Sequence, residues 1–194
     1  MACKNCSSKK LSKILNFGKQ PVSSVFYSKK TYNLKSYSLD LYICKNCNLV
    51  QFKSLAPLDE MYGQTYGYRT SLSKLMVRHI ADKNLTILRS IKLKKSDYIL
   101  DIGSNDGTFL NTFAKKNYFN CFGVDPSSEK FKEYYDKKIN LICDYFPSDK
   151  LQLRLEKSEK FKSFKLISSF AMFYDIENPN EFCRKIYNLL DNEG

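Results

Sequence analysis

The stretch YILDIGSNDGTFL, residues 98–110, decides the fold of this chain. Its apolar run ends at an acidic residue, Asp101, and a loop containing Gly103 and Gly107 leads into a second apolar run. This order is typical of a buried parallel strand, a tight glycine turn and a helix, which together open many nucleotide-binding α/β domains. The chemistry of the loop therefore indicates which ligand the domain binds.

The loop reads Asp-x-Gly-x-x-x-Gly, and this spacing excludes two phosphate sites. A dinucleotide loop needs a third glycine, and a P-loop needs Gly-Lys before Ser or Thr. Asp106 would also repel pyrophosphate. S-adenosylmethionine fits better, because it has a sulfonium and an amino group but no phosphate, and glycines let the backbone approach it. We expect contacts from Asp101, Gly103, Asn105, Asp106 and Gly107, unless the loop is only a turn with Asp106 as its helix cap.

Two later segments complete the predicted nucleoside pocket. Asp125, in FGVDPS, lies 24 residues after Asp101. In doubly wound folds a carboxylate about 20 residues after the glycine loop binds the ribose hydroxyls. The segment CDYF follows the next strand, and we expect Asp144 and Phe146 to supply a hydrogen-bond acceptor and an apolar face for adenine.

Alternation of strands and helices predicts a Rossmann-like parallel sheet with covering helices. A long helix precedes the alternation, and the charged run LRLEKSEKFKSFK is interpreted as a solvated face. The expected strands are 98–102, 121–124, 139–143 and 164–169, and the expected helices are 71–91, 108–116, 128–137 and 179–190.

Four of the seven cysteines form two CKNC pairs, Cys3 with Cys6 and Cys44 with Cys47, separated by 37 residues. Two such turns can aim four thiolates at one tetrahedral ion, so we expect structural zinc, with an iron–sulfur centre or redox thiols as alternatives. Four cysteines leave no open position for catalysis. The predicted organisation is a zinc module of short strands over 1–56, a tyrosine-rich connector and helix over 57–95, and a cofactor-binding domain over 96–194.

The charge of the chain is uneven. The 194 residues have a net charge of +12, of which +8 lies in residues 1–70. This excess indicates either an anionic partner, such as nucleic acid or a diphosphate-bearing small molecule, or only compositional bias towards Lys. The chain contains no apolar run long enough for a membrane span and no secretory signal, so a cytoplasmic location is the default expectation.

The order of these motifs resembles the sugar C-methyltransferase family that acts on nucleotide-linked deoxysugars. Its members have a four-cysteine zinc module, a Tyr-x-Tyr-x-[ST]-Ser segment, here YGYRTS, and a class I methyltransferase domain, here with ILDIGSNDGTFL and FGVDPS. The resemblance implies S-adenosylmethionine-dependent C-methylation of a keto-deoxysugar, with Tyr66 and Tyr68 in acid–base or enolate contacts. Where the family has a histidine, SSFAMFYDIENP places Asp175. The single histidine, His79, falls in the predicted helix.

The resemblance also leaves alternatives open. The family continues with further strands and a C-terminal domain, so we expect this chain to be a fragment, a truncated product or one half of a split enzyme. A non-catalytic protein that binds zinc and cofactor is the second hypothesis. An RNA methyltransferase is the third and is disfavoured, because scattered Lys and the tyrosines near residue 66 form no recognisable RNA-binding module.

Overall fold

The computed structural model describes residues 1–26, 33–63 and 65–194 of the chain. The chain divides into two compact units. The first unit consists of Met1–Tyr68 and Phe173–Cys183, and the second consists of Arg69–Met172 and Arg184–Gly194. A segment that follows the last strand in sequence therefore belongs to the same unit as the N-terminal cysteines.

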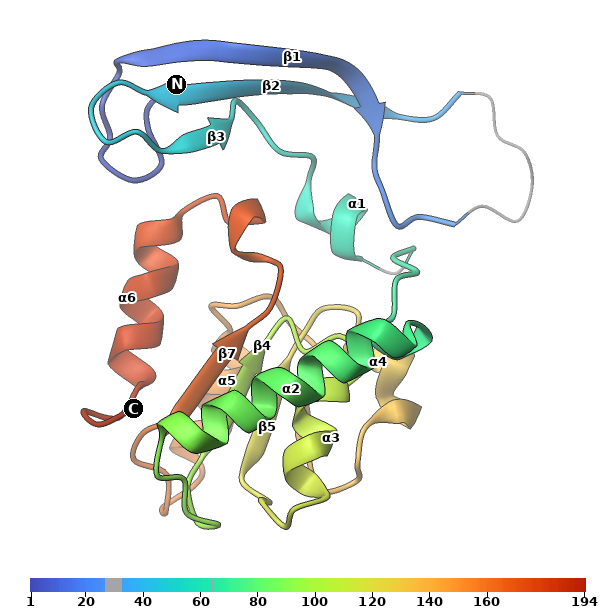
Figure 1. Cartoon of the computed structure of the whole chain (residues 1–194), viewed down its shortest axis with the longest axis vertical. Coiled ribbons are helices and arrows are strands. Elements are labelled where there is room, and N and C mark those ends of the chain that lie inside the picture. Colours follow the sequence, from blue (N-terminus) through green and yellow to red (C-terminus); the bar gives the residue numbers. More distant parts are fainter. Residues whose placement is uncertain (27–32, 64) are drawn as a thin grey trace. The chain divides into compact units, whose positions relative to one another are not determined.

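The first unit contains an antiparallel sheet of strand order β1-β2-β3 (Figure 1). The strands are β1 (Leu11–Pro21), β2 (Ser36–Cys44) and β3 (Val50–Phe52). β2 contains the segment YSLDLYIC, residues 37–44, whose partial alternation and content of Tyr, Leu and Ile are typical of a strand. The expectation of short strands only is wrong, because β1 has 11 residues. Most side chains of β1 are exposed, so backbone pairing with β2 holds it and leaves no alternating apolar pattern in its sequence.

Three short helical segments complete the first unit. They are α1 (Leu58–Tyr62), the 3-10 turn η3 (Phe173–Asp175) and the first residues of α6 (Pro179–Leu189). The predicted helix at 179–190 is confirmed as α6. The ring of Phe173 meets the buried Phe182 at 5.8 Å in an edge-to-face arrangement, so residues 173–183 fold back on themselves.

The second unit is built on a four-stranded parallel sheet of order β6-β5-β4-β7. All four predicted strands are confirmed, three of them one or two residues shorter than expected at their ends. Near-continuous apolar runs are typical of parallel strands that are covered on both faces, and every residue of β4 and β5 is buried. The strands are β4 (Ile99–Ile102), β5 (Cys121–Val124), β6 (Asn140–Ile142) and β7 (Leu166–Ser169).

The helix predicted at 71–91 is confirmed as α2 (Lys74–Ser90), which begins later than expected. A 3-10 turn, η1 (Thr70–Leu72), precedes it, and the Ser73 hydroxyl caps it by accepting from the Met76 N–H at 3.3 Å. Of the apolar residues of α2, Ile80 is buried and Ile87 and Leu88 are partly buried against the core, whereas Leu75 is 79% exposed.

The remaining helices follow the glycine loop and the strands. The helix predicted at 108–116 is confirmed as α3 (Thr108–Ala114). The helix predicted at 128–137 is shorter, with α4 (Ser128–Phe131) followed by the 3-10 turn η2 (Lys132–Tyr134). Helix α5 (Asp149–Glu156) precedes and enters the charged run at 153–165. The interpretation of that run as a solvated face is wrong at Leu155 and Phe164, which are buried.

Helices α2 and α3 pack on the same face of the sheet (Figure 1). Their apolar side chains and those of β4 form the main core of the second unit, in which the Phe109 and Phe113 rings meet edge to face at 5.1 Å. Burial of this core fixes the carboxyl ends of β4 and β5, where the acidic residues of the predicted site follow. Within the described parts of the chain, no helix has the length and apolar character that a membrane span requires.

Candidate functional site

The four paired cysteines converge in the first unit. Their Sγ atoms all lie within 4.8 Å of one another, with Cys3 3.6 Å from Cys47 and Cys6 3.6 Å from Cys44. Four sulfurs at about 2.3 Å from a tetrahedral zinc ion lie at similar separations. The donor set therefore fits zinc with no position left for substrate.

The two CKNC turns have the same backbone geometry. The Ser7 N–H donates to the Cys3 carbonyl and the Asn48 N–H donates to the Cys44 carbonyl, each at 2.9 Å. Ser7 and Asn48 both have a positive φ, 58° and 60°. The Asn46 side-chain amide donates to Cys6 Sγ at 3.5 Å and lowers the pKa of that thiol to about 6. A lowered pKa favours the thiolate form that a metal binds.

The glycine loop of the second unit requires glycine at both predicted positions. Gly103 and Gly107 have φ of +74° and +73°, a conformation that costs a residue with a Cβ free energy. A Cβ on Gly107 would also lie 2.6 Å from the Tyr135 ring, and one on Gly103 would lie 3.0 Å from Met172 Sδ. The loop is therefore a tight turn whose backbone is closely covered.

Asp101, the third residue of β4, has a buried carboxyl group that accepts a hydrogen bond from the Ser168 hydroxyl at 2.7 Å. Burial, opposed by the hydrogen bond from Ser168 and assisted by the nearby charge of Asp125, raises the pKa of Asp101 to about 7. Burial thus disfavours the charged carboxylate of Asp101, and a cation bound beside it would stabilise that charge. The site therefore favours a positively charged ligand over an anionic one.

Asp125 follows β5 and connects that strand to the glycine loop. Its Oδ2 accepts from the Asn105 N–H at 2.9 Å, and its Oδ1 accepts from the N–H and the hydroxyl of Ser127 at 2.7 and 2.5 Å. Burial raises the pKa of Asp125, and these donors partly offset the shift. Oδ1 thus already accepts two hydrogen bonds, whereas Oδ2 accepts one and has lone-pair capacity for a further donor, such as a ribose hydroxyl.

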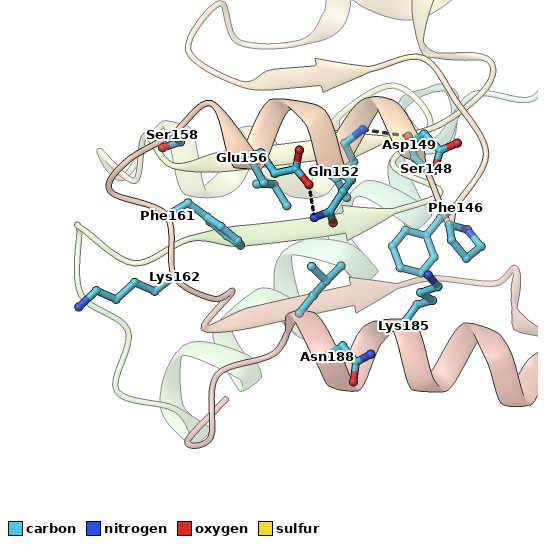
Figure 2. Close-up of a pocket in the computed structure, with 14 residues that line it drawn as sticks. Phe146, Ser148, Asp149, Gln152, Glu156, Ser158, Phe161, Lys162, Lys185 and Asn188 are labelled. Carbon is cyan, nitrogen blue, oxygen red and sulfur yellow. Dashed lines mark hydrogen bonds between the residues drawn. The ribbon is translucent and has the colours of Figure 1, made fainter.

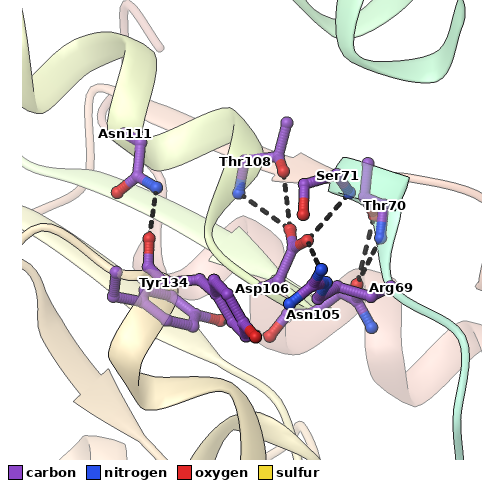
Figure 3. A network of polar contacts seen from close by, with 9 residues as sticks. Arg69, Thr70, Ser71, Asn105, Asp106, Thr108, Asn111 and Tyr134 are labelled. Carbon is purple, nitrogen blue, oxygen red and sulfur yellow. Dashed lines mark hydrogen bonds and ion pairs between the residues drawn. The ribbon is translucent and has the colours of Figure 1, made fainter. Parts of the chain in front are cut away.

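Asp106 has partners within the fold (Figure 3). Its side chain is fully buried, and its Oδ1 accepts from the N–H and hydroxyl of Thr108, the first residue of α3, at 3.2 and 2.6 Å. Its Oδ2 accepts from the Ser71 N–H at 2.8 Å, and the Asn105 side-chain oxygen accepts from the Thr70 N–H at 2.9 Å. The N-cap position of α3 is Gly107, and Asp106, one residue before it, accepts from the first N–H of the helix. Asp106 also fastens residue 71 to the loop, and its contact with the cofactor stays a prediction.

Arg69 joins this network and was not singled out from the sequence. Its Nε lies 4.0 Å from Asp106 Oδ2, and its guanidinium carbon lies 3.8 Å from the centre of the Tyr134 ring (Figure 3). Stacking on an aromatic face and pairing with a buried carboxylate hold a guanidinium in one orientation. The only signal in the sequence was the position of Arg69 inside the YGYRTS motif.

The predicted adenine residues follow β6. Asp144 Oδ2 accepts from the Ser148 hydroxyl at 2.8 Å, and that hydroxyl caps α5 by accepting from the Leu151 N–H at 3.1 Å. Phe146 lines a groove of about 540 Å³ formed by residues of α5, α6 and the segments beside them (Figure 2). The role of both residues in binding adenine stays a prediction.

The three predicted catalytic residues all lie in the first unit. The Tyr62 hydroxyl donates to Asp175 Oδ2, the Tyr66 ring meets the Tyr62 ring at 5.3 Å, and the Tyr68 ring lies 6.4 Å from that of Tyr66. Burial raises the pKa of Asp175, while the Tyr62 hydroxyl and the charge of Lys4 oppose the shift. Tyr62 is a new member of the group, and the only sequence signal for it was the local density of tyrosines. His79 is exposed on α2.

Asp101 gives the first testable prediction. Because its pKa in the folded protein is about 7, the carboxyl ionises between pH 6 and 8, and we expect affinity for S-adenosylmethionine to rise over this interval by up to about tenfold per pH unit. Calorimetric titration of the wild type and Asp101→Asn at each pH removes the ligand's own titration from the comparison. Equal pH dependence in both proteins would contradict the prediction.

The raised pKa of Asp101 also predicts how the free energy of unfolding of the ligand-free protein changes with pH. Between pH 4 and 7 the folded state holds a proton on Asp101 that the unfolded state has lost, so the free energy of unfolding falls as pH rises through this window. Asp101→Asn should flatten this part of the profile, as measured by urea denaturation.

A parallel Rossmann-like sheet whose glycine loop is lined by acidic residues and lacks the phosphate motifs defines the class of S-adenosylmethionine-dependent methyltransferases. Residues 75–194 match the sequence model of a family described as a methyltransferase domain, and residues 3–62 match that of a family described as a zinc binding domain. The first match covers more than half of the chain, and the chain belongs to the methyltransferase domain family. No curated protein matches the chain.

Solved structures of the plantazolicin methyltransferase BpumL are similar in part. The complex with a pentazolic desmethylPZN analogue and SAH is 22% identical, covers 60% of this chain and 42% of that chain, and has a TM-score of 0.43. The complex with a triazolic analogue and SAH is also 22% identical, covers 63% of this chain and 46% of that chain, and has a TM-score of 0.46. This chain thus spans less than half the length of either BpumL chain, and so low a likeness indicates nothing about its substrate.

The family matches agree with three predictions from the sequence. The α/β fold with a preceding cysteine module, S-adenosylmethionine as the cofactor and structural zinc are confirmed. The sugar nucleotide substrate, the individual site residues and the cytoplasmic location stay predictions.

Proposed function

We propose that the chain is a C-methyltransferase that acts on a nucleotide-linked keto-deoxysugar. The observation that carries the proposal is the grouping of Asp175 with Tyr62 and Tyr66 in the same unit as the zinc-binding cysteines. The resemblance of YGYRTS and the flanking motifs to the sugar C-methyltransferase family supports it. Methylation at carbon requires a base strong enough to remove a weakly acidic C–H proton. Oxygen and nitrogen substrates are usually more acidic and do not require so strong a base.

The proposed chemistry assigns each group one role. Asp175 removes the proton from the carbon beside the keto group, and a hydroxyl of Tyr66 or Tyr68 donates to the enolate oxygen that forms. The carbon then forms a bond to the methyl group as the bond from methyl to sulfur breaks, and the electron pair stays on sulfur. S-adenosylmethionine supplies an electrophilic methyl group, and the proton on Asp175 passes to water.

The state of Asp175 suits this role. Its half-buried carboxyl has a raised pKa, so the carboxylate is a stronger base than one in water. The hydrogen bond from Tyr62 and the charge of Lys4 oppose this shift and favour the carboxylate form. The net charge of +8 over residues 1–70 falls to about +6 with four thiolates on a zinc dication, and this positive charge supports recognition of the diphosphate of a sugar nucleotide.

The test is a methyl-transfer assay with a panel of nucleotide-linked keto-deoxysugars, read by mass spectrometry. We expect a product one methyl group heavier, and Asp175→Asn should lower the rate by about a hundredfold or more while affinity for S-adenosylmethionine stays unchanged. Glu181→Gln, an exposed acid on α6, is the matched control.

A second readout separates proton removal from methyl transfer. In deuterated water without S-adenosylmethionine, the wild type should exchange the sugar proton beside the keto group, and Asp175→Asn should not. Full activity of Asp175→Asn would exclude this residue as the base. Cofactor binding without product from any sugar would favour the non-catalytic alternative.

A further inference from the structure

The first CKNC turn contacts the segment that contains Asp175. The Lys4 ammonium donates to the Ile176 carbonyl at 3.4 Å and lies 3.0 Å from Glu177 Oε2. The Asn180 side-chain amide donates to the carbonyls of Asn5 and Lys4 at 2.6 and 3.4 Å. Both of these carbonyls lie between the zinc ligands of the turn.

The contact between the first CKNC turn and residues 176–180 depends more on hydrogen bonds to backbone carbonyls than on the Lys4–Glu177 ion pair. Glu177 is 75% exposed on its side chain, so its ion pair with Lys4 is screened by solvent and contributes little. The Lys4 side chain is only 13% exposed, and its bond to a backbone carbonyl orders the chain next to Asp175. The Asn180 bonds require the turn carbonyls to point in a defined direction.

The opposite side of the turn is fixed as well. The Lys4 N–H donates to Gln51 Oε1 at 2.9 Å, and the Gln51 side-chain amide donates to the Ala2 carbonyl at 3.3 Å. Gln51 is buried in β3. Residues 2–5 therefore lie between the small sheet and the segment 173–180, and the thiolates of this turn can hold its carbonyls in place only while the ion is bound.

We propose that Lys4 and Asn180 are positioning residues that fasten residues 173–180 to the first zinc turn, so that zinc binding orders the segment containing Asp175. The inference rests on the proposed function only where it assigns Asp175 a role in catalysis. Because coupling between two sites is reciprocal, ordering of the segment also strengthens zinc binding. Zinc binding would then both stabilise the fold of the zinc module and order residues 173–180.

The experiment combines Lys4→Met, which keeps the aliphatic part of the side chain, with Asn180→Ala in the full zinc-loaded chain. Amide hydrogen exchange of residues 173–178 should become about tenfold faster or more, while amides of β4 are unchanged and one zinc ion stays bound. Methyl transfer should fall by about tenfold in kcat, with affinity for S-adenosylmethionine within about twofold. Lys9→Met with Asn188→Ala, at two exposed positions of the same turn region and the same helix, is the control.

A second arm uses the wild type alone. Removal of zinc with a chelator should accelerate exchange at residues 173–178, and zinc should restore protection. Competition with a zinc indicator should show weaker zinc binding in the double variant by a factor similar to the change in exchange.

The outcomes separate the two proposals. Unchanged exchange in the double variant, with folding confirmed by the protected β4 amides, overturns the coupling whatever the activity. Faster exchange with normal kcat supports the coupling and shows that this ordering does not limit methyl transfer, while the role of Asp175 is decided by Asp175→Asn. Faster exchange with reduced kcat and unchanged cofactor affinity supports the coupling and also supports the proposed role of Asp175 in catalysis.

Discussion

Cys44→Ser should release the zinc ion and unfold the first unit. In the described part of that unit the buried hydrophobic residues are only Cys3, Cys44 and Phe182, so apolar burial cannot hold its three strands together. Structural zinc contributes an apparent free energy of about 10–16 kcal/mol in small modules at neutral pH, far more than such a core can. Cys44 is fully buried at the centre of the cluster, and a serine hydroxyl is a poor replacement for a thiolate.

The measurements are zinc stoichiometry and hydrogen exchange in the full chain. We expect one zinc ion in the wild type, less than one in Cys44→Ser, and loss of protection in β2 while β4 stays protected. Cys183→Ser, at an exposed cysteine of α6, is the matched control and should keep the ion. Protected β2 amides in zinc-free Cys44→Ser would contradict the prediction and would show that the sheet folds without the metal.

The parallel sheet could be predicted from sequence because burial determines the composition of its strands. β5 begins and ends where the apolar run CFGV does, and β4 stops at the residue before Gly103. By contrast, β1 is held by backbone pairing with β2, and its exposed side chains leave no periodic signal. Helix α5 was missed because its two buried leucines lie among charged residues, and its cap at Ser148 was not considered.

In the candidate site, too, residues with a local sequence pattern could be predicted and residues without one could not. Cys3, Asp101 and Asp125 could be predicted as candidates because a local pattern, either a short spacing or the end of a strand, singles them out. Residues that act through contacts between distant parts of the chain, such as Tyr62 with Asp175, have no such pattern. The sequence also could not show that residues 173–183 belong to the unit of the zinc-binding cysteines, because that association depends on side-chain contacts across more than 170 positions.

Asp125→Asn should weaken binding of S-adenosylmethionine by about tenfold to a hundredfold, which corresponds to about 1.4–2.7 kcal/mol. The carboxylate accepts from N–H groups on both oxygens, from Asn105 on one and Ser127 on the other. An asparagine can accept on only one side, and in either orientation its NH₂ group faces a backbone N–H. The substitution therefore removes the proposed ribose acceptor and also loosens the glycine loop.

Calorimetric titration with S-adenosylmethionine measures the affinity, and thermal unfolding separates the two effects. Asp82→Asn, at an exposed acid on α2, is the control and should bind as the wild type does. Ser127→Ala removes one hydroxyl donor but leaves the carboxylate in place, so we expect a smaller loss than for Asp125→Asn. If Asp125→Asn is folded and binds as tightly as Asp82→Asn, the end of β5 does not hold the ribose. The acidic site would then consist of Asp101 alone, since the carboxylate of Asp106 is occupied by Thr108 and Ser71.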